Sequence, residues 1–333
     1  PVENMDILSL LQPLLYSFFL LVPLSILFLH TQKQSKKEKK AKKKVGEAAT
    51  APVLKPYPVL GHLPQFLSNC HRYTEWSTEL LLRSPTQTVS LHTPLVDGVV
   101  TANPVNVEHM LRTRFDNYPK GDLFTSILED FLGAGIFNVD GEEWRRQRKA
   151  ASFEFSTRAL RDFAARSVRE EIVGRLLPLL RAAAAEGAVL DLQDVLQRFA
   201  FDGICRVAFG FDPACLAGGD NSSAFMRAFD AAASLSADRF MYPLPQVWRA
   251  KRALDVGSER KLRQSIAEVH DFAVEIIRSR RRKEERGSSD DLLSRFSTDS
   301  TNSEELLRDI VVSFILAGRE TTSSALTWFF WLL

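Results

Sequence analysis

The sequence predicts a mainly α-helical protein with a small β-sheet. Of its 333 residues, 45% are hydrophobic and 25% are charged, a composition typical of a globular chain. Strand-like alternation is confined to Thr88–His92 and Gly98–Thr101, on either side of a Pro/Asp/Gly turn. Asn103 followed by Pro104 predicts the start of a helix. Further on, apolar residues recur at helical spacing over about 142–150, 157–183, 191–210, 222–236, 258–285 and 304–333.

The N-terminal segment predicts a membrane anchor. Ile7 to Leu29 contains no ionisable side chain, and as a helix it would be about 35 Å long, enough for a hydrocarbon core of ~30 Å. Eight lysines and one glutamate follow between Lys33 and Lys44. The positive-inside rule therefore places residues 1–6 in the lumen and the remainder in the cytosol.

Two other interpretations of this segment are weaker. A cleaved signal peptide would need basic residues before a shorter apolar core and small residues at its end, and neither is found. A lysine run can bind nucleic acid, but next to a spanning helix lipid headgroups are the better partner. The formal net charge of only +2 also argues against a nucleic-acid partner.

We expect a transmembrane anchor at 7–29, a basic and proline-rich connector at 30–61, and one domain at 62–333. The prolines of the connector restrict the backbone and make it stiff and extended. Met5 is the expected start, with Pro1–Asn4 as an upstream extension. Three cysteines without a Cys/His cluster predict a reducing compartment and no structural zinc site.

The last predicted helix carries an unusual combination of residues. Thr301 and Glu304 have the spacing of a capping box, and an apolar stripe follows. From Leu326 onward the residues are apolar on every face, so we expect that end to be buried. The chain then stops without a capping glycine or a terminal cation, and we interpret it as a fragment of a longer protein.

Within this helix, Ala317, Gly318, Glu320 and Thr321 form a compact motif. A glycine inside a helix costs about 1 kcal/mol relative to alanine, so it needs a local reason. The Thr321 hydroxyl can bond to the carbonyl of Ala317, four residues earlier. One interpretation is a notch for helix packing, which is the commoner use of such a glycine. The other is a groove lined by a hydroxyl and a carboxylate.

A second pair lies on the helix predicted at 142–150. Trp144 and Arg148 are four residues apart and therefore share one helix face. An indole N–H beside a guanidinium can hold a carboxylate, because both groups are donors. The alternative is an exposed amphipathic helix whose tryptophan packs on the core.

The sequence resembles a microsomal cytochrome P450. The resemblance rests on five features in this order: the anchor, the lysine run, the proline connector, the Trp144/Arg148 helix and the Ala317-Gly318-x-Glu320-Thr321-Thr322 helix. The resemblance implies the cytochrome P450 fold, here an N-terminal anchor and an incomplete haem domain that ends in the long central helix. It also implies haem b as cofactor, with Trp144 and Arg148 on a propionate.

The same resemblance assigns roles along the last helix. Ala317 and Gly318 would lie against the haem, with Gly318 forming a groove for dioxygen. Glu320 and Thr321 would be the catalytic acid–alcohol pair that passes protons into a water-poor site. Phe314 and Ile315 would face the substrate.

Three further segments, Phe131–Asn138, Arg198–Gly210 and Thr321–Trp331, resemble plant fatty-acid ω-hydroxylases and their relatives that oxidise jasmonoyl–amino acid conjugates. This implies hydroxylation of a fatty acid at or near the ω carbon, with electrons from NADPH through NADPH–cytochrome P450 reductase. The implied partners are this reductase, membrane lipid and a fatty-acid or acyl-conjugate substrate. The implied location is the endoplasmic reticulum membrane, with a single span and the catalytic domain facing the cytosol.

The chain departs from the family at the iron ligand. The family's cysteine loop would lie beyond Leu333, so the sequence contains no expected metal ligand and the fragment alone should be inactive. We assign Cys205 to the core and Cys215 to a loop, since neither has the surroundings of a ligand loop. The alternative function is a short, catalytically inactive membrane-anchored protein that lacks the haem thiolate.

Overall fold

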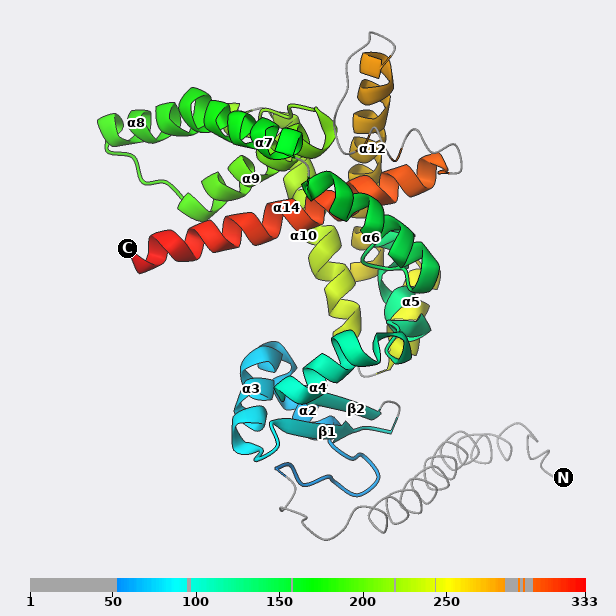
Figure 1. Ribbon diagram of the computed structural model, residues 1–333. Helices are drawn as coiled ribbons and strands as arrows, with labels where there is room; N and C mark the ends of the chain where they lie inside the picture. The colour runs from blue at the N-terminus through cyan, green and yellow to red at the C-terminus, as the bar shows by residue number, and fades with distance from the viewer. Residues whose placement is uncertain are drawn as a thin grey trace, which may run out of the picture. The chain divides into compact units, whose positions relative to one another are not determined.

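The computed structural model describes residues 53–94, 97–156, 158–218, 220–242, 244–284, 293, 296 and 302–333 (Figure 1). The anchor predicted at 7–29 and the lysine run lie outside the described residues. No helix within the described ranges has an apolar stretch long enough to cross a membrane.

The described chain is mostly helical and contains one antiparallel strand pair, as the sequence predicts. It divides between Tyr118 and Pro119 into two compact units. The strands are β1 (Thr88–His92) and β2 (Asp97–Thr101). The α-helices are α2 (Leu63–Asn69), α3 (Tyr73–Arg83), α4 (Pro104–Glu108), α5 (Gly121–Leu132), α6 (Gly141–Ser156), α7 (Arg158–Glu171), α8 (Leu177–Glu186), α9 (Leu192–Phe209), α10 (Asp220–Asp238), α11 (Pro245–Ala253), α12 (Ser258–Glu284) and α14 (Glu304–Leu332).

The first unit is built on the β1–β2 hairpin. The register pairs Thr88 with Thr101 and His92 with Asp97, and the two threonine hydroxyls lie 2.8 Å apart. Trp76 and Leu80 of α3 pack against Val89 of β1. The predicted cap is confirmed: the side chain of Asn103 accepts the backbone N–H of Val105 at the start of α4.

The core of the second unit is formed by four long helices. α14 packs along α9, and α10 packs along α12 (Figure 1). Phe201, Phe229, Val269, Ile276 and Val311 are completely buried between them. The apolar stripe of α14 therefore does face a core, as its periodicity predicts.

The helix expected over 157–183 is interrupted. The structure has α7, then one turn of π-helix, η4 (Ile172–Leu176), and then α8. Pro178 explains the break: it has no N–H for the carbonyl of Gly174, and its ring crowds that carbonyl, so the turn widens by one residue. The apolar pattern continues through the wider turn and gives no sign of it.

Four helices were missed by the periodicity argument: α2, α3, α5 and α11. Pro245 lies between the helices expected at 222–236 and 258–285, and in the structure it begins α11. Proline suits the first turn of a helix, where its missing N–H is not needed. α2 likewise has its proline in the first turn.

Both ends of α14 differ from the expectation. Its N-cap is Ser303, whose hydroxyl accepts the N–H of Leu306 at 3.2 Å, and not Thr301. Ser303 has the extended backbone that lets a cap side chain turn back to the helix. At the other end, Leu326 packs with Val195 and Phe199. The residues beyond it were expected to be buried, but Trp328 to Leu333 are 47–86% exposed because no described element packs on them.

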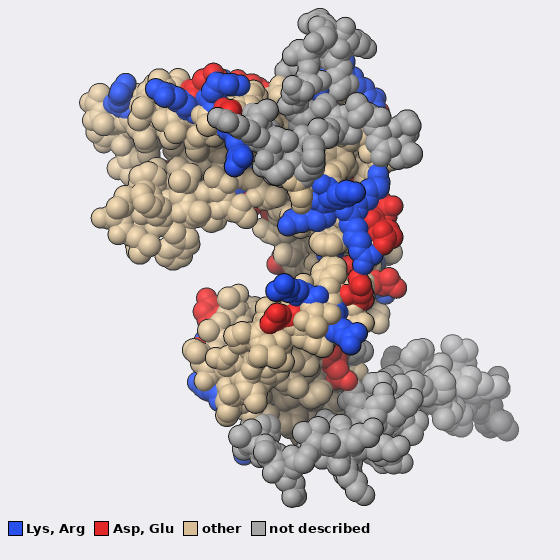
Figure 2. All heavy atoms as spheres, viewed as in Figure 1, with Lys and Arg blue, Asp and Glu red and all other residues tan. Residues whose placement is uncertain are grey.

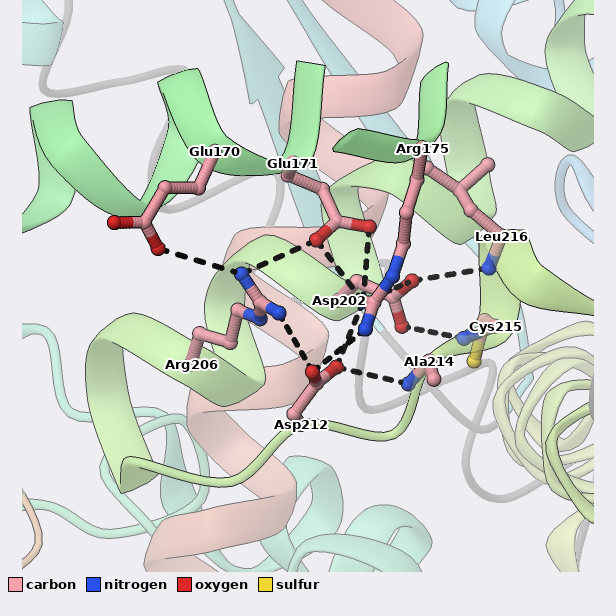
Figure 3. Close-up of polar contacts among 9 residues, drawn as sticks. All are labelled: Glu170, Glu171, Arg175, Asp202, Arg206, Asp212, Ala214, Cys215 and Leu216. Atoms are coloured by element: carbon pink, nitrogen blue, oxygen red, sulfur yellow. Dashed lines mark hydrogen bonds and ion pairs between the residues drawn. The ribbon is translucent and has the colours of Figure 1, made fainter. Parts of the chain in front are cut away.

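A charged cluster joins α7, η4 and α9 (Figure 3). Arg175 donates to both oxygens of Asp212, at 2.8 and 2.7 Å, and also to the buried Glu171. Arg206 donates to Asp212 at 2.6 Å and lies 3.4 Å from Glu171. Hydrogen bonds from the two arginines hold the pKa of Asp212 well below its usual range.

Asp202 ties the short helix η5 (Cys215–Ala217) to α9. Its carboxylate is completely buried and accepts the backbone N–H groups of Cys215 and Leu216 (Figure 3). Cys205 lies in the core, as predicted. Cys215 was assigned to a loop, but it begins the short helix η5 and is 1% exposed, because Asp202 holds the backbone at this point against the core.

Candidate functional site

The second unit contains a cavity of about 610 Å³ between α6 and α14. Its walls also include one residue of α9 and the turn that precedes α6. The lining residues are Lys120, Ile136, Phe137, Trp144, Arg148, Ala151, Ser152, Ile204, Ser313, Phe314, Ala317, Gly318 and Thr322. Most of this surface is apolar, and donor groups are concentrated on the α6 side.

Trp144 and Arg148 both line the cavity from α6. Their spacing of four residues puts them on one helix face. Gln147 is 3% exposed and donates to the carbonyl of Ala134 at 2.8 Å, which fixes the rotation of α6 about its axis. Trp144 is half-buried and Arg148 is exposed. The structure thus places an indole and a guanidinium in the lining of the same cavity.

Lys120 is a third donor, which the sequence did not single out. Its Nζ donates to the carbonyl of Val139 at 2.6 Å and lies 3.7 Å from the carboxylate of Asp140. Asp140 also accepts the N–H groups of Lys120 and Gly121, both at 3.0 Å. Burial by itself raises the pKa of Asp140, but these bonds outweigh it and hold the pKa below its usual value. The ionised Asp140 thereby keeps Lys120 beside α6.

On the α14 side, three residues singled out from the sequence line the cavity: Phe314, Ala317 and Gly318. A Cβ on Gly318 would lie 2.5 Å from Cγ1 of Ile204, so the glycine is required where α9 crosses α14. The packing notch and the cavity wall are therefore the same position. The structure adds Ser313, which immediately precedes Phe314, and Thr322, one turn after Gly318.

Glu320, Thr321 and Ile315 are not among the residues that line the described cavity. The hydroxyl of Thr321 donates to the carbonyl of Ala317 at 2.6 Å, the bond predicted from its spacing. Glu320 lies 2.8 Å from Nη1 of Arg319. Ile315 is completely buried in the core, because its face of α14 points away from the cavity.

Arg319 was missed by sequence reasoning because it occupies the variable position of the motif. Its guanidinium is completely buried, and Nη1 donates to Asp230 of α10 at 2.6 Å. The same Nη1 contacts Glu320, so one buried cation joins two carboxylates. Only tertiary structure brings Asp230 to this place, 89 residues away in the chain.

The chain belongs to the cytochrome P450 family: the sequence model of that family, described as Cytochrome P450, matches residues 51–333. It is 50% identical over 274 residues to "Cytochrome P450 CYP94D108" of Paris polyphylla, covering 82% of this chain and 54% of that protein. It is 44% identical to "Cytochrome P450 94A1" of Vicia sativa over 84% of this chain and 55% of the relative. Against "Cytochrome P450 94B1" of Arabidopsis thaliana it is 48% identical over 83% and 55%. The chain spans about half the length of these curated relatives.

The family implies a haem, and the donor set of the cavity fits part of such a group. Trp144, Arg148 and Lys120 supply donors for carboxylates, and Phe314, Ala317 and Ile204 supply apolar walls for a flat macrocycle. The described lining contains no cysteine. Cys205 lies in the core, where burial raises its thiol pKa well above the usual value and disfavours the thiolate that a metal requires.

Proposed function

We propose that the complete protein is a haem-thiolate monooxygenase that hydroxylates fatty acids at or near the ω carbon. The observation that carries this proposal is that Trp144 and Arg148 line the same cavity as Ala317 and Gly318. Membership of the cytochrome P450 family supports the reaction class. The resemblance of three segments to plant fatty-acid hydroxylases supports the substrate class.

The α6 side of the cavity would hold the haem. Trp144 and Arg148 would donate to a propionate, and Lys120 adds a second cation on the same side. When bound through a cysteine thiolate, haem supplies the activation of dioxygen. In the proposed complete protein that cysteine belongs to the part beyond the segment matched here.

The α14 side would position the substrate and exclude water. Phe314 and Ala317 present apolar surface, and Ile136 and Phe137 oppose them from the turn before α6. An acyl chain matches such walls, since burial of each methylene contributes about 0.8 kcal/mol. Ile315 contributes through the packing of α14 on the core and not through direct contact.

Glu320 and Thr321 are the proposed proton-delivery pair. The Thr321 hydroxyl now donates to the Ala317 carbonyl, and rotation about its Cα–Cβ bond would turn it toward the cavity. Glu320 is half-buried, and Arg319, which stays charged, anchors its carboxylate. The carboxylate itself would take up a proton and release it to the Thr321 hydroxyl. A hydroxyl backed by a carboxylate lets protons enter while the apolar walls keep bulk water out.

We also propose that the protein is anchored in the endoplasmic reticulum membrane and receives electrons from NADPH–cytochrome P450 reductase. The first proposal rests on the apolar segment 7–29 and the lysines that follow it, which lie outside the described residues. The second rests on family membership.

The test begins with the transcript. Reading it past the codon for Leu333 should reveal a frame that continues into a cysteine ligand loop. The complete gene product, loaded with haem and supplied with reductase and NADPH, should convert dodecanoate to a product hydroxylated at or near the terminal carbon. If the protein instead oxidises jasmonoyl–isoleucine and not dodecanoate, the substrate class is the jasmonoyl–amino acid conjugates. An immediate stop, or a haem-loaded protein that oxidises neither, would overturn the proposal.

A further inference from the structure

The glycine turn, residues 133–138 between α5 and α6, is held directly on α14. The carboxylate of Asp309 is 4% exposed and accepts the backbone N–H of Ala134 through Oδ2 at 2.9 Å. Its other oxygen, Oδ1, accepts two bonds from Arg308, at 2.9 and 2.7 Å. Arg308 thus fixes the carboxylate and leaves one oxygen for the turn, 175 residues away in sequence.

Two glycines make this contact possible. Gly133 has a φ of +49°, and a Cβ there would overlap the carboxylate of Asp309. A Cβ on Gly135 would overlap the hydroxyl of Ser313 and lie 2.9 Å from the carbonyl oxygen of Asp309. The turn therefore lies against two successive turns of α14 with no space for a side chain between them.

Further hydrogen bonds join the turn to α5 and α6. Gln147 of α6 donates to the carbonyl of Ala134 at 2.8 Å. Asn138, which is 5% exposed, donates to the carbonyls of Gly133 and Thr125, at 3.0 and 3.1 Å. The turn is fastened to α5, α6 and α14 together, and Asp309 supplies the link to α14.

We infer that Asp309 is a positioning residue that sets the shape of the cavity. Ile136 and Phe137 follow Gly135 directly, and both line the cavity opposite Phe314. The bond from Ala134 to Asp309 holds the turn that carries both residues on α14. Releasing that bond lets both side chains move against the α14 wall and changes which ligand fits. The identity of the ligand rests on the proposed function. The bond by which Asp309 holds Ala134 of the glycine turn, here called the clamp, does not.

The test uses the complete, haem-loaded gene product and two readouts. The first is hydrogen exchange of the Ala134 amide, followed in a peptide that spans the glycine turn. Asp309→Ala should speed this exchange about tenfold or more, the effect expected for losing a bond to a charged acceptor. The second is the dissociation constant of dodecanoate from its spectral shift. This constant should rise about twofold to tenfold. The apparent affinity scales with the fraction of molecules in which the glycine turn lies against α14.

Two further variants separate the clamp from simple destabilisation. Asp309→Asn keeps one acceptor oxygen, which can still accept from Ala134 when its NH2 group is turned toward Arg308. Its exchange should therefore lie between that of the parent and that of Asp309→Ala. Gly135→Ala leaves Asp309 intact but forces the turn away from Ser313, so it should reproduce the weaker dodecanoate binding. Gly203→Ala is the matched control, since an added Cβ on α9 meets nothing within 4 Å. It should leave both readouts unchanged.

Exchange that stays slow in Asp309→Ala would overturn the clamp. Fast exchange with unchanged ligand binding would overturn its role in shaping the cavity. If the parent protein binds no dodecanoate, the proposed substrate class fails, and the same variants are then titrated with 4-phenylimidazole. A parallel change in its affinity would still support Asp309 as the residue that positions the wall.

Discussion

Asp202 accepts the backbone N–H of Cys215 at 2.8 Å, and both residues are almost completely buried. The same carboxylate accepts the N–H of Leu216 at 3.0 Å and lies 3.9 Å from Arg175. A buried carboxylate is costly unless its oxygens are bonded, and here two backbone donors and a nearby cation fulfil that need. The bond fixes the segment after α9 onto the helix that packs along α14.

Asp202→Asn should therefore destabilise the protein by about 2–4 kcal/mol. The amide group can accept one of the two N–H donors but places its own N–H₂ against the other. The measurement is the free energy of unfolding from denaturant titration. Asp194→Asn is the matched control, because this aspartate forms only an exposed pair with Arg198 on the same helix and should change stability by less than about 0.5 kcal/mol. Equal effects would contradict the buried role of Asp202.

Stability should fall on acidification through the Asp212 carboxylate. Its pKa in the folded state is held low by the bonds from Arg175 and Arg206, so its contribution is complete above the ordinary carboxyl pKa of about 4 and is lost as the pH falls below it. Asp212→Asn should flatten the fall of the unfolding free energy below about pH 4, measured by denaturant titration at a series of acidic pH values. Glu186→Gln, an exposed acid at the end of α8, should leave the dependence unaltered.

Glu171 in the same cluster contributes with the opposite sign. Burial, followed by the nearby Asp202, raises its pKa, so the folded state favours the protonated form. Its charge therefore costs stability at neutral pH, and this cost disappears on acidification. The measurement compares the pH dependence of the unfolding free energy in Glu171→Gln, in Asp212→Asn and in the double variant. This comparison separates the contributions of the two carboxylates.

Thr321→Ala should uncouple the proposed reaction. NADPH should still be consumed in the complete enzyme, but with less hydroxylated product, because the proton-delivering hydroxyl is gone. Thr321→Ser should retain coupling. Thr327→Ala is the control: its hydroxyl also donates to the carbonyl four residues earlier, at 2.8 Å, but it lies outside the motif from Ala317 to Thr322. Unchanged coupling in Thr321→Ala would exclude the relay role.

Arg148→Ala should weaken haem retention about tenfold or more, the effect expected for losing a charge-assisted bond to a carboxylate. The measurement is haem absorbance per polypeptide after transfer to an excess of apomyoglobin. Lys149→Ala removes a neighbouring cation of α6 that does not line the cavity. Normal haem occupancy in Arg148→Ala would count against the propionate contact.

Gly318→Ala should destabilise the junction of α9 and α14 by about 1–3 kcal/mol, the usual cost of overpacking a core. The new methyl would overlap Ile204, which lies across the interface. Adding Ile204→Ala should recover much of this loss, so the pair should show a favourable coupling energy in a double-mutant cycle. Additive losses would show that the glycine is needed for a reason other than α9.

Local patterns were sufficient for much of the fold. The antiparallel hairpin, the cap at Asn103 and the apolar stripe of α14 follow from periods of 2 and 3.6 and from side-chain capping. The break at η4 could not be read from the apolar pattern, because Val168, Ile172 and Leu176 recur every four residues through it. The exposed end of α14 could not be read either, since apolar composition does not say which element covers it.

The sequence by itself determined the family. It also determined the long helix α14 and the faces that Trp144 shares with Arg148 and Ala317 shares with Thr321. These are properties of neighbours three or four residues apart, which helix geometry places together whatever the rest of the chain does. Only the tertiary structure decided that Lys120 and Thr322 reach the cavity, that Ile315 does not, and that Asp309 holds the glycine turn. These contacts join residues far apart in the chain, so they depend on how the side chains of packed helices interlock, and no local pattern encodes that.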